Sequence, residues 1–296
     1  MSQDWQILLE LMALEKIDEN TYRGNNHQTL NNRLFGGQVL AQSMRAAQET
    51  VSIDRTVHSQ HAYFLRPGDS SLPIIFHVDN IRDGKSFTTR RVVASQSGRA
   101  IFNTSLSFQV KETGLNHQVD MPQCPPPEEL QDDNIRWNKV LEAMDRQLAS
   151  NSTKRRPSLR PIDIRPVEPV DYLNPTERPP EQFIWMKAKG LVEENNEQSN
   201  SALHHAILAY ASDFSLMSTS LLPHGKSIID QNLHAASLDH AIWFHDSFRV
   251  DEWLLYHMHS SRSSASRGLS RGSLYARDGR LVASTIQEGL IRIAKG

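Results

Sequence analysis

Three polar residues in the second half of the sequence could together form a site for chemistry. Asp213 follows an apolar run with helical spacing, and we place it on that predicted helix, with its carboxylate against a covered surface. An unpaired buried charge is costly, so this carboxylate needs hydrogen-bond donors. Ser237, just before a predicted strand, and Gln287, which interrupts the apolar last strand, could each supply one. The residues alone leave two interpretations open: a catalytic trio, or a helix cap with buried hydrogen bonds.

A serine nucleophile is a second candidate. Residues 268–272 read G-L-S-R-G and match the G-x-S-x-G pattern, which exposes a serine on a sharp turn between a strand and a helix. No histidine follows Ser270, although that fold places its histidine after the nucleophile. Asp278-Gly279 predicts a hairpin where the pattern needs a helix. We therefore interpret this stretch as an exposed strand and turn.

Histidines near predicted strands are candidate metal ligands. With the period of two in a strand, Asp239 and His245 face one way and His240 the other, so a shared metal is not expected. The other close pairs, His58 with His61 and His204 with His205, also point apart. The chain has no phosphate-binding loop, dinucleotide fingerprint or C-x-x-C pair. Core or surface roles are expected for these histidines, and no metal or cofactor is predicted.

The elements that would position these residues repeat along the chain. The first half predicts a short helix over 5–17, a helix after Gly36-Gly37, and extended runs from His58 to Val110 separated by Asp-Gly and Ser-Gly turns. The glycine pair would let the backbone pass close to a neighbouring surface. The second half predicts the same order: a strand near 183–189, a helix over 202–217 and extended runs to the end. Each half therefore predicts one helix packed on an antiparallel sheet.

Short sequence matches indicate an internal duplication. The stretch from His61 resembles the stretch from His240, and Gly98-Arg99 resembles Gly279-Arg280. This register sets Leu106 opposite Gln287, and a match between the two helices sets Arg45 opposite Asp213. Only the second half is then equipped with the trio. We expect the halves to pack as a pseudo-dimer whose seam is the first place to look for a ligand.

Between the halves lies a proline-rich stretch, in which only residues 135–148 look helical. Prolines remove backbone donors, so we interpret it as a linker that wraps the surface. The predicted boundaries are 1–115 for the first repeat, 116–180 for the linker and 181–296 for the second repeat.

Composition limits the classes of function. The 296 residues are 38% apolar and 22% charged, with a net charge of -2, which favours a sizeable core and disfavours nucleic acid or anionic lipid as partners. The single cysteine, Cys124, rules out an intrachain disulfide and favours an intracellular protein. No signal peptide, membrane span or Ser-Lys-Leu terminus is predicted, so the cytoplasm is the expected location.

Five motifs, in the same order along the chain, closely resemble acyl-CoA thioesterase II, the TesB type. They read F-G-G-Q at 35–38, H-A-Y-F-L-R-P-G-D at 61–69, Y-A-S-D at 210–213, L-D-H-A-I-W-F-H at 238–245 and A-S-T-I-Q-E-G at 283–289. The resemblance spans nearly the whole chain and is weakest in the linker. It implies an α+β double hot-dog fold, in which each half wraps a curved antiparallel sheet around a long helix.

The resemblance also implies a function and roles for the trio. The activity would be hydrolysis of acyl-CoA thioesters without a cofactor, with Asp213, Ser237 and Gln287 orienting and activating a water. Asp213 would be the base, and Ser237 stands where bacterial relatives often carry threonine. Direct attack by the Asp213 carboxylate through an anhydride stays open.

The expected partners are an acyl-CoA substrate and further copies of the same chain. The substrate would be an acyl-CoA, and the basic cluster Lys154-Arg155-Arg156 is either a solvated turn or a contact for CoA phosphates. A homo-oligomer is expected, favoured by long sheet edges. One alternative is a hot-dog enoyl-CoA hydratase, which would need an Asp and His pair on one catalytic face. The other is an acyl-CoA binder without activity.

Overall fold

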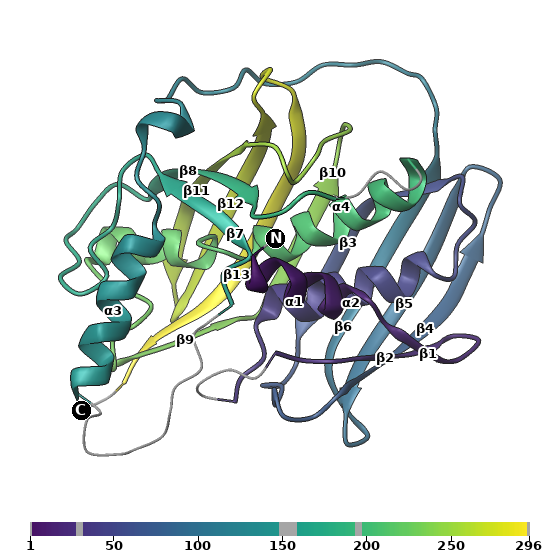
Figure 1. Cartoon of the computed structure of the whole chain (residues 1–296), viewed down its shortest axis with the longest axis horizontal. Coiled ribbons are helices and arrows are strands. Elements are labelled where there is room, and N and C mark those ends of the chain that lie inside the picture. The colour runs from purple at the N-terminus through teal and green to yellow at the C-terminus, as the bar shows by residue number, and fades with distance from the viewer. Residues whose placement is uncertain (1, 28–31, 148–158, 193–196, 295–296) are drawn as a thin grey trace.

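In the computed structural model, described here for residues 2–27, 32–147, 159–192 and 197–294, one antiparallel sheet runs through the whole molecule. Its strands follow the order β1-β2-β4-β5-β6-β3-β10-β13-β12-β11-β8-β7, with β9 paired to β13 outside this path. Figure 1 shows the helices α1, α2 and α4 between the two curved halves of the sheet. No helix in the described ranges is long and apolar enough to cross a membrane.

The first half forms largely as the sequence predicts, with one correction: the helix predicted over 5–17 ends at Met12, and the chain then forms two short strands, β1 and β2, that were not predicted. Its elements are α1 (Gln3–Met12), β1 (Glu15–Asp18), β2 (Thr21–Gly24), α2 (Gly36–Gln48), β3 (Arg55–Phe64), β4 (Ile74–Asp83), β5 (Phe87–Gln96) and β6 (Arg99–Val110). The Ser-Gly turn between β5 and β6 has φ of +47° at Ser97 and +73° at Gly98, the conformation that a tight hairpin requires. Helix α2 is buried along almost its whole length, and its small residues allow the sheet to close around it.

The second half repeats this layout. Its elements are β8 (Glu181–Ala188), α4 (Glu197–Ser212), the 3-10 helix η2 (Met217–His224), β9 (Leu233–Ser237), β10 (Asp239–Phe244), β11 (Leu254–Ser264), β12 (Arg267–Ala276) and β13 (Leu281–Ile293). Outward from the seam the strands run β3, β6, β5, β4, β2 on one side and β10, β13, β12, β11, β8 on the other. The predicted double hot-dog fold is confirmed.

The two halves are joined at a seam formed by β3 and β10. These strands pair antiparallel, with Gln60 opposite Ile242 and Ala62 opposite His240, and α2 packs on α4 beneath them. Most buried apolar side chains of both halves belong to one continuous core, and a smaller cluster that includes Trp185 and Trp253 is separate from it. The seam is therefore part of the hydrophobic core rather than a loose contact between domains.

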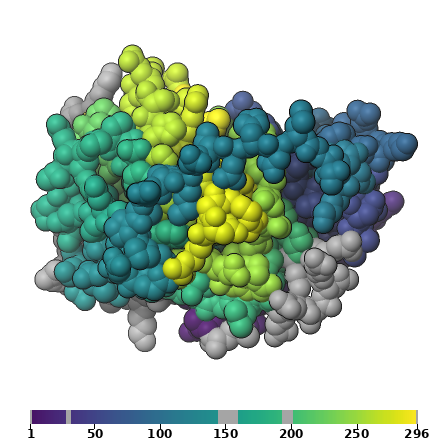
Figure 2. Space-filling view, turned by 90° about the horizontal axis from the view of Figure 1, so that it is seen from above, coloured from purple at the N-terminus to yellow at the C-terminus, as the bar shows by residue number. Residues whose placement is uncertain are grey.

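The linker contains more regular structure than its prolines suggested. Besides η1 (Pro127–Glu129) and the predicted helix, here α3 (Asn134–Gln147), it supplies the strand β7 (Ile162–Pro166), which pairs with β8 at one end of the sheet. The side chain of Gln118 bonds to the backbone of Gly279 and Leu281, so the extended part crosses the hairpin between β12 and β13. Figure 2 shows this segment lying across the surface of the second half.

The two ends of the sheet differ from the long edges that the sequence suggested. The terminal strands are β1, with four residues, and β7, with five, and both carry charged side chains; β7 also ends in a proline. Short, charged, proline-bearing edges oppose edge-to-edge pairing. The ends of the sheet therefore do not support the predicted homo-oligomer, which stays a prediction.

Strand pairing corrects the register of the duplication near the seam. Gln60 lies across from Leu106, Arg90 lies across from Leu106 on its other side, and Ser270 lies across from Gln287. The β10–β13 register, extended by one residue, sets His240 across from Gln287. The equivalent of His240 is therefore the buried Gln60 rather than His61, which is exposed on the opposite face. Because side chains alternate along a strand, the one-residue error in the sequence match exchanged the two faces.

The same correspondence shows how the two halves differ at the trio. Both halves interrupt the inner strand with a bulge, after Val57 in the first half and after Ser237 in the second. The first half places the buried apolar residues Val57 and Leu106 where the second half places Ser237 and Gln287. The matched positions are thus apolar in one half and polar in the other.

Candidate active site

The structure brings the three predicted residues together. The Gln287 side-chain amide is central: its Nε2 donates to Oδ1 of Asp213 at 2.7 Å and to Oγ of Ser237 at 3.0 Å. Gln287 is fully buried on β13, whereas Ser237 ends β9 and is partly exposed. Asp213 and Ser237 lie 74 and 50 positions before Gln287 in the chain, and the three side chains are therefore held in one hydrogen-bonded group.

Asp213 lies at the end of α4 rather than within it. The predicted helix extended to Met217, but α4 ends at Ser212 and the chain then turns. The helix end leaves the carboxylate free to project toward the first half of the chain. The Asp213 side chain is only 7% exposed.

The first half contributes a backbone donor to this carboxylate. Oδ2 of Asp213 accepts the N–H of Gly37, in the first turn of α2, at 2.9 Å. Phe35, the N-cap residue of α2, makes no capping hydrogen bond with its side chain. The carboxylate of Asp213, from the other half, acts as the cap instead. An anion is favoured at a helix N-terminus, where free N–H groups and the helix dipole converge.

The predicted close approach at the glycine pair is confirmed. A Cβ on Gly36 would stand 2.8 Å from Oδ2 of Asp213, and a Cβ on Gly37 would overlap the carbonyl oxygen of Tyr210. The two helices can therefore meet at this point only if both residues lack side chains. The sequence predicted the contact but not that it carries a hydrogen bond to the candidate base.

Burial dominates the electrostatics of Asp213. Loss of water raises the pKa of its carboxyl to about 6, against the lowering effect of the hydrogen bonds from Gln287 and Gly37. At neutral pH the group is mostly ionised, yet its pKa is close enough to that pH to take up and release a proton. This is the range that suits a general base.

A buried histidine lies next to the trio and was missed as part of it. Nε2 of His240 lies 3.0 Å from Oγ of Ser212, and its Nδ1 lies 3.9 Å from Oδ1 of Asp213. Burial lowers the pKa of this imidazole to about 3, so it is neutral. From the sequence, His240 was a candidate only for a metal ligand or a core residue. The signal that could have identified it is its position on the same strand face as the apolar residues Ile242 and Phe244, which indicates a buried side chain.

The serine of the G-x-S-x-G pattern is not a nucleophile elbow. Ser270 lies within β12, fully buried and directly across from Gln287, rather than on a strand-to-helix turn. The stretch is a strand, as predicted, but the expectation that it is exposed is wrong for Ser270. The inner face of β12 covers the site from one side.

The candidate metal ligands are engaged elsewhere. Asp239 accepts the backbone N–H of Glu288, and His245 bonds to Ser284 on the outer face. Within the part of the chain that the structure describes, no three His, Cys, Asp or Glu residues gather as a metal site. The cluster Lys154-Arg155-Arg156 lies outside the described residues.

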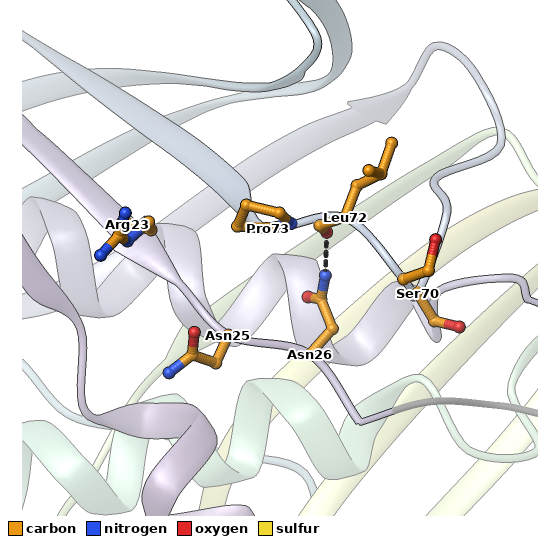
Figure 3. A pocket seen from close by; sticks show the side chains of 7 residues that line it. Arg23, Asn25, Asn26, Ser70, Leu72 and Pro73 are labelled. Carbon is orange, nitrogen blue, oxygen red and sulfur yellow. Dashed lines mark hydrogen bonds between the residues drawn. The ribbon is translucent and has the colours of Figure 1, made fainter.

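A surface pocket lies beside α2, and none of the residues that line it belongs to the trio. It is lined by Arg23, Asn25, Asn26, Ser70, Ser71, Leu72 and Pro73, all from the first half (Figure 3). Asn26 bonds to the carbonyl of Leu72 across it and to Gln38 on α2. The pocket has no titratable group placed for proton transfer, so the trio remains the better candidate for chemistry.

Comparison with known families gives two matches. The acyl-CoA thioesterase family matches residues 157–290, and the acyl-CoA thioesterase N-terminal domain matches residues 25–109. Each half of the molecule thus has its own family match, and the trio lies within the first of these ranges.

Individual relatives match over the full length. The chain is 37% identical to acyl-CoA thioesterase 2 of Haemophilus influenzae over 295 residues, all of both chains. It is 39% identical to mouse acyl-coenzyme A thioesterase 8, over 97% of this chain and 89% of the mouse protein. The crystal structure of the acyl-CoA thioesterase II TesB2 from Mycobacterium marinum superposes with a TM-score of 0.78 at 37% identity, covering 98% of this chain and 99% of that one. A hot-dog protein of unknown function from Alicyclobacillus acidocaldarius shares the fold, with a TM-score of 0.74 at 15% identity, covering 98% of this chain and 99% of that one.

Proposed function

The chain belongs to the TesB-type acyl-CoA thioesterase II family, and we propose that it hydrolyses acyl-CoA thioesters with a water activated by Asp213, Ser237 and Gln287. The observation that carries the roles of the trio is the Gln287 amide, which donates to the carboxylate and to the hydroxyl at once. An amide in this position holds two proton acceptors in one orientation. A water that contacts both can then be aimed at a carbonyl carbon.

The proposed reaction needs no group beyond the chain and a water. Asp213 removes a proton from the water, and the oxygen of that water attacks the thioester carbonyl carbon. The tetrahedral intermediate collapses, the C–S bond breaks, and the proton on Asp213 passes to the departing thiolate. General-base help of this kind contributes about 10² to 10⁴ in rate.

Each partner of Asp213 has a distinct role in this scheme. Gly37 and Gln287 each donate to one carboxylate oxygen, which fixes the plane of the base. The Ser237 hydroxyl accepts from Gln287, so its own hydrogen is free to point toward the water or the substrate. Because Ser237 is partly exposed whereas Gln287 is fully buried, the substrate would approach from the side of Ser237.

Three variants test the trio in a thiol-release assay with a panel of acyl-CoAs. Asp213→Asn keeps the size of the side chain but removes the base, and Gln287→Leu and Ser237→Val introduce the residues of the first half. Each should fold and lose most turnover. Asp246→Asn, which changes an exposed carboxylate outside the site, is the matched control. Near-normal rates in the three variants would return the trio to a structural role.

Attack by the carboxylate itself predicts a different fate for its oxygen atoms. If Asp213 attacked the thioester, hydrolysis of the resulting anhydride at the aspartyl carbon would leave solvent oxygen in the side chain. A single turnover in ¹⁸O-labelled water with enzyme in excess, followed by mass analysis of the peptide with Asp213, distinguishes the routes. The water mechanism predicts label in the fatty acid alone.

The hydratase alternative gains one observation, since His240 and Asp213 do form an adjacent pair. However, His240 is fully buried and its Nε2 is bonded to Ser212, so its imidazole is not presented to a substrate. An enoyl-CoA distinguishes the two reactions, because hydration removes the conjugated double bond without releasing thiol. An acyl-CoA binder would do neither.

A further inference from the structure

His240 is a buried side chain with one ring nitrogen engaged and the other directed at Asp213. Within the described chain, Nδ1 of His240 has no hydrogen-bond partner. We propose that His240 is a positioning residue for hydrolysis, whose Nδ1 accepts a hydrogen bond from Asp213 once that carboxyl has taken the proton of the water. The inference rests on the proposed function of Asp213 as the base.

The hydrogen-bond network determines which nitrogen of His240 carries the hydrogen. The hydroxyl of Ser212 donates its single hydrogen to the carbonyl of Ala209 at 2.9 Å, so it can only accept from His240. Nε2 of His240 is therefore the donor, at 3.0 Å. Nδ1 is left with a lone pair, and burial in an apolar wall keeps the ring neutral.

This tautomer makes the contact with Asp213 dependent on the proton. At 3.9 Å, Nδ1 of His240 and Oδ1 of Asp213 are too far apart for a hydrogen bond, and with an ionised carboxylate both atoms present lone pairs. When Asp213 becomes protonated, Oδ1 can donate to Nδ1 once the two side chains move to within hydrogen-bond distance, and the pair then gains a bond that the ionised state lacks. His240 thus stabilises the protonated form of Asp213 during the reaction, and the proton stays on Asp213 until the thiolate leaves.

The first half of the molecule shows that the structural role of His240 does not require a histidine. At the equivalent position Gln60 is also fully buried, and its Nε2 donates to the carbonyl of Leu40 on α2 at 3.0 Å. Both residues tie the inner strand to the helix beneath it. A glutamine suffices for that tie, whereas only the imidazole adds a second nitrogen on the side of Asp213.

The other groups around Asp213 do not compete for this role. Two phenols are close enough to affect it, Tyr210 on α4 and Tyr256 on β11, and burial raises the pKa of both, so they stay neutral. Tyr256 is also hydrogen-bonded to the carbonyl of Ser212 and to the hydroxyl of Thr285.

The remaining neighbours of Asp213 carry no free charge. The contacts from α2 and β13 are the uncharged amides of Gly37 and Gln287. The carboxyl of Asp239 on β10 is bonded to the Glu288 backbone, and the Glu288 carboxylate is paired with Arg267.

Two replacements of His240 separate its two nitrogens. His240→Gln keeps a donor at the Nε2 position, as Gln60 does, and removes Nδ1. His240→Asn places an amide oxygen near the Nδ1 position and removes the tie to Ser212. The assay is thiol release from an acyl-CoA that the wild-type enzyme hydrolyses, recorded as kcat and KM over a pH series, with thermal unfolding of each variant.

His240→Gln should fold with wild-type stability and keep KM, but lose about tenfold in kcat. The acidic limb of its pH profile, where kcat falls as Asp213 becomes protonated, should also move to lower pH, because the acceptor that favours protonated Asp213 is gone. His240→Asn should be less stable yet keep the acidic limb of the wild type. Combined with Asp213→Asn, His240→Gln should have no further effect on the residual rate.

An unchanged kcat and acidic limb in His240→Gln would overturn the proposal, whereas an active Asp213→Asn would overturn the function of the trio first. If His240→Gln does not fold, ¹⁵N chemical shifts of His240 in the wild-type enzyme test the same point. They should show hydrogen on Nε2 only, and hydrogen on Nδ1 would refute the assigned geometry.

Discussion

Gly37 of the first half donates its backbone N–H to Asp213 of the second half, and the two residues are 176 positions apart in the chain. The candidate base is therefore oriented by both repeats, although all three trio side chains come from one. The apolar core that joins α2 to α4 thus fixes the distance on which the site depends.

Gly37→Ala tests this dependence. Its new methyl group would overlap the carbonyl oxygen of Tyr210, so α2 and α4 must separate and the donor must move away from Asp213. Forced repacking of this kind destabilises by about 1–3 kcal/mol, and a shift of about 1 Å at the site can reduce kcat by about 10²-fold. Thermal unfolding and thiol release measure the two effects. Gly114→Ala is the matched control, because nothing lies within 4 Å of its added Cβ, and it should behave as wild type.

Gln287→Leu should shift the pH profile in the direction opposite to His240→Gln. The hydrogen bond from Gln287 lowers the pKa of Asp213, so its removal raises that pKa above about 6. Activity that depends on ionised Asp213 is lost as pH falls through this pKa, and the acidic limb should therefore move to higher pH. The kcat should fall even at high pH, because Ser237 also loses its donor. A limb that stays in place would show that Gln287 does not act on the base.

The sequence predicted the location of the trio because period-two and helical patterns identify which residues interrupt apolar faces. Gln287 stood out on an apolar strand, and its match with Leu106 showed that the two halves differ there. The role of Gly37 could not be derived in this way, since it depends on how two helices distant in sequence meet. His240 was missed for a related reason: its match with His61 was one residue out of register, and in a strand that error exchanges the buried and exposed faces.

Asp213→Asn should change how stability depends on pH. The carboxyl has a folded-state pKa of about 6, raised from 3.8, so the folded protein binds its proton more tightly than the unfolded chain does. The wild-type enzyme should therefore lose free energy of unfolding as pH rises from about 4 to about 6, by at most about 3 kcal/mol from this group. The asparagine variant lacks this loss. Urea unfolding at several pH values measures the difference, and parallel curves for both proteins would show that Asp213 has an ordinary pKa.

Ser237→Thr should preserve activity, whereas Ser237→Val should not. Threonine keeps the hydroxyl that accepts from Gln287, and a β-branched residue is favoured in the extended backbone at the end of β9. Valine has nearly the same shape without the hydroxyl and is the residue that the first half carries at position 57. We expect kcat within about threefold of wild type for threonine and a loss of about 10²-fold or more for valine. Because the two variants differ mainly in one hydroxyl, equal kcat values for both would show that this group neither orients the water nor contacts the substrate.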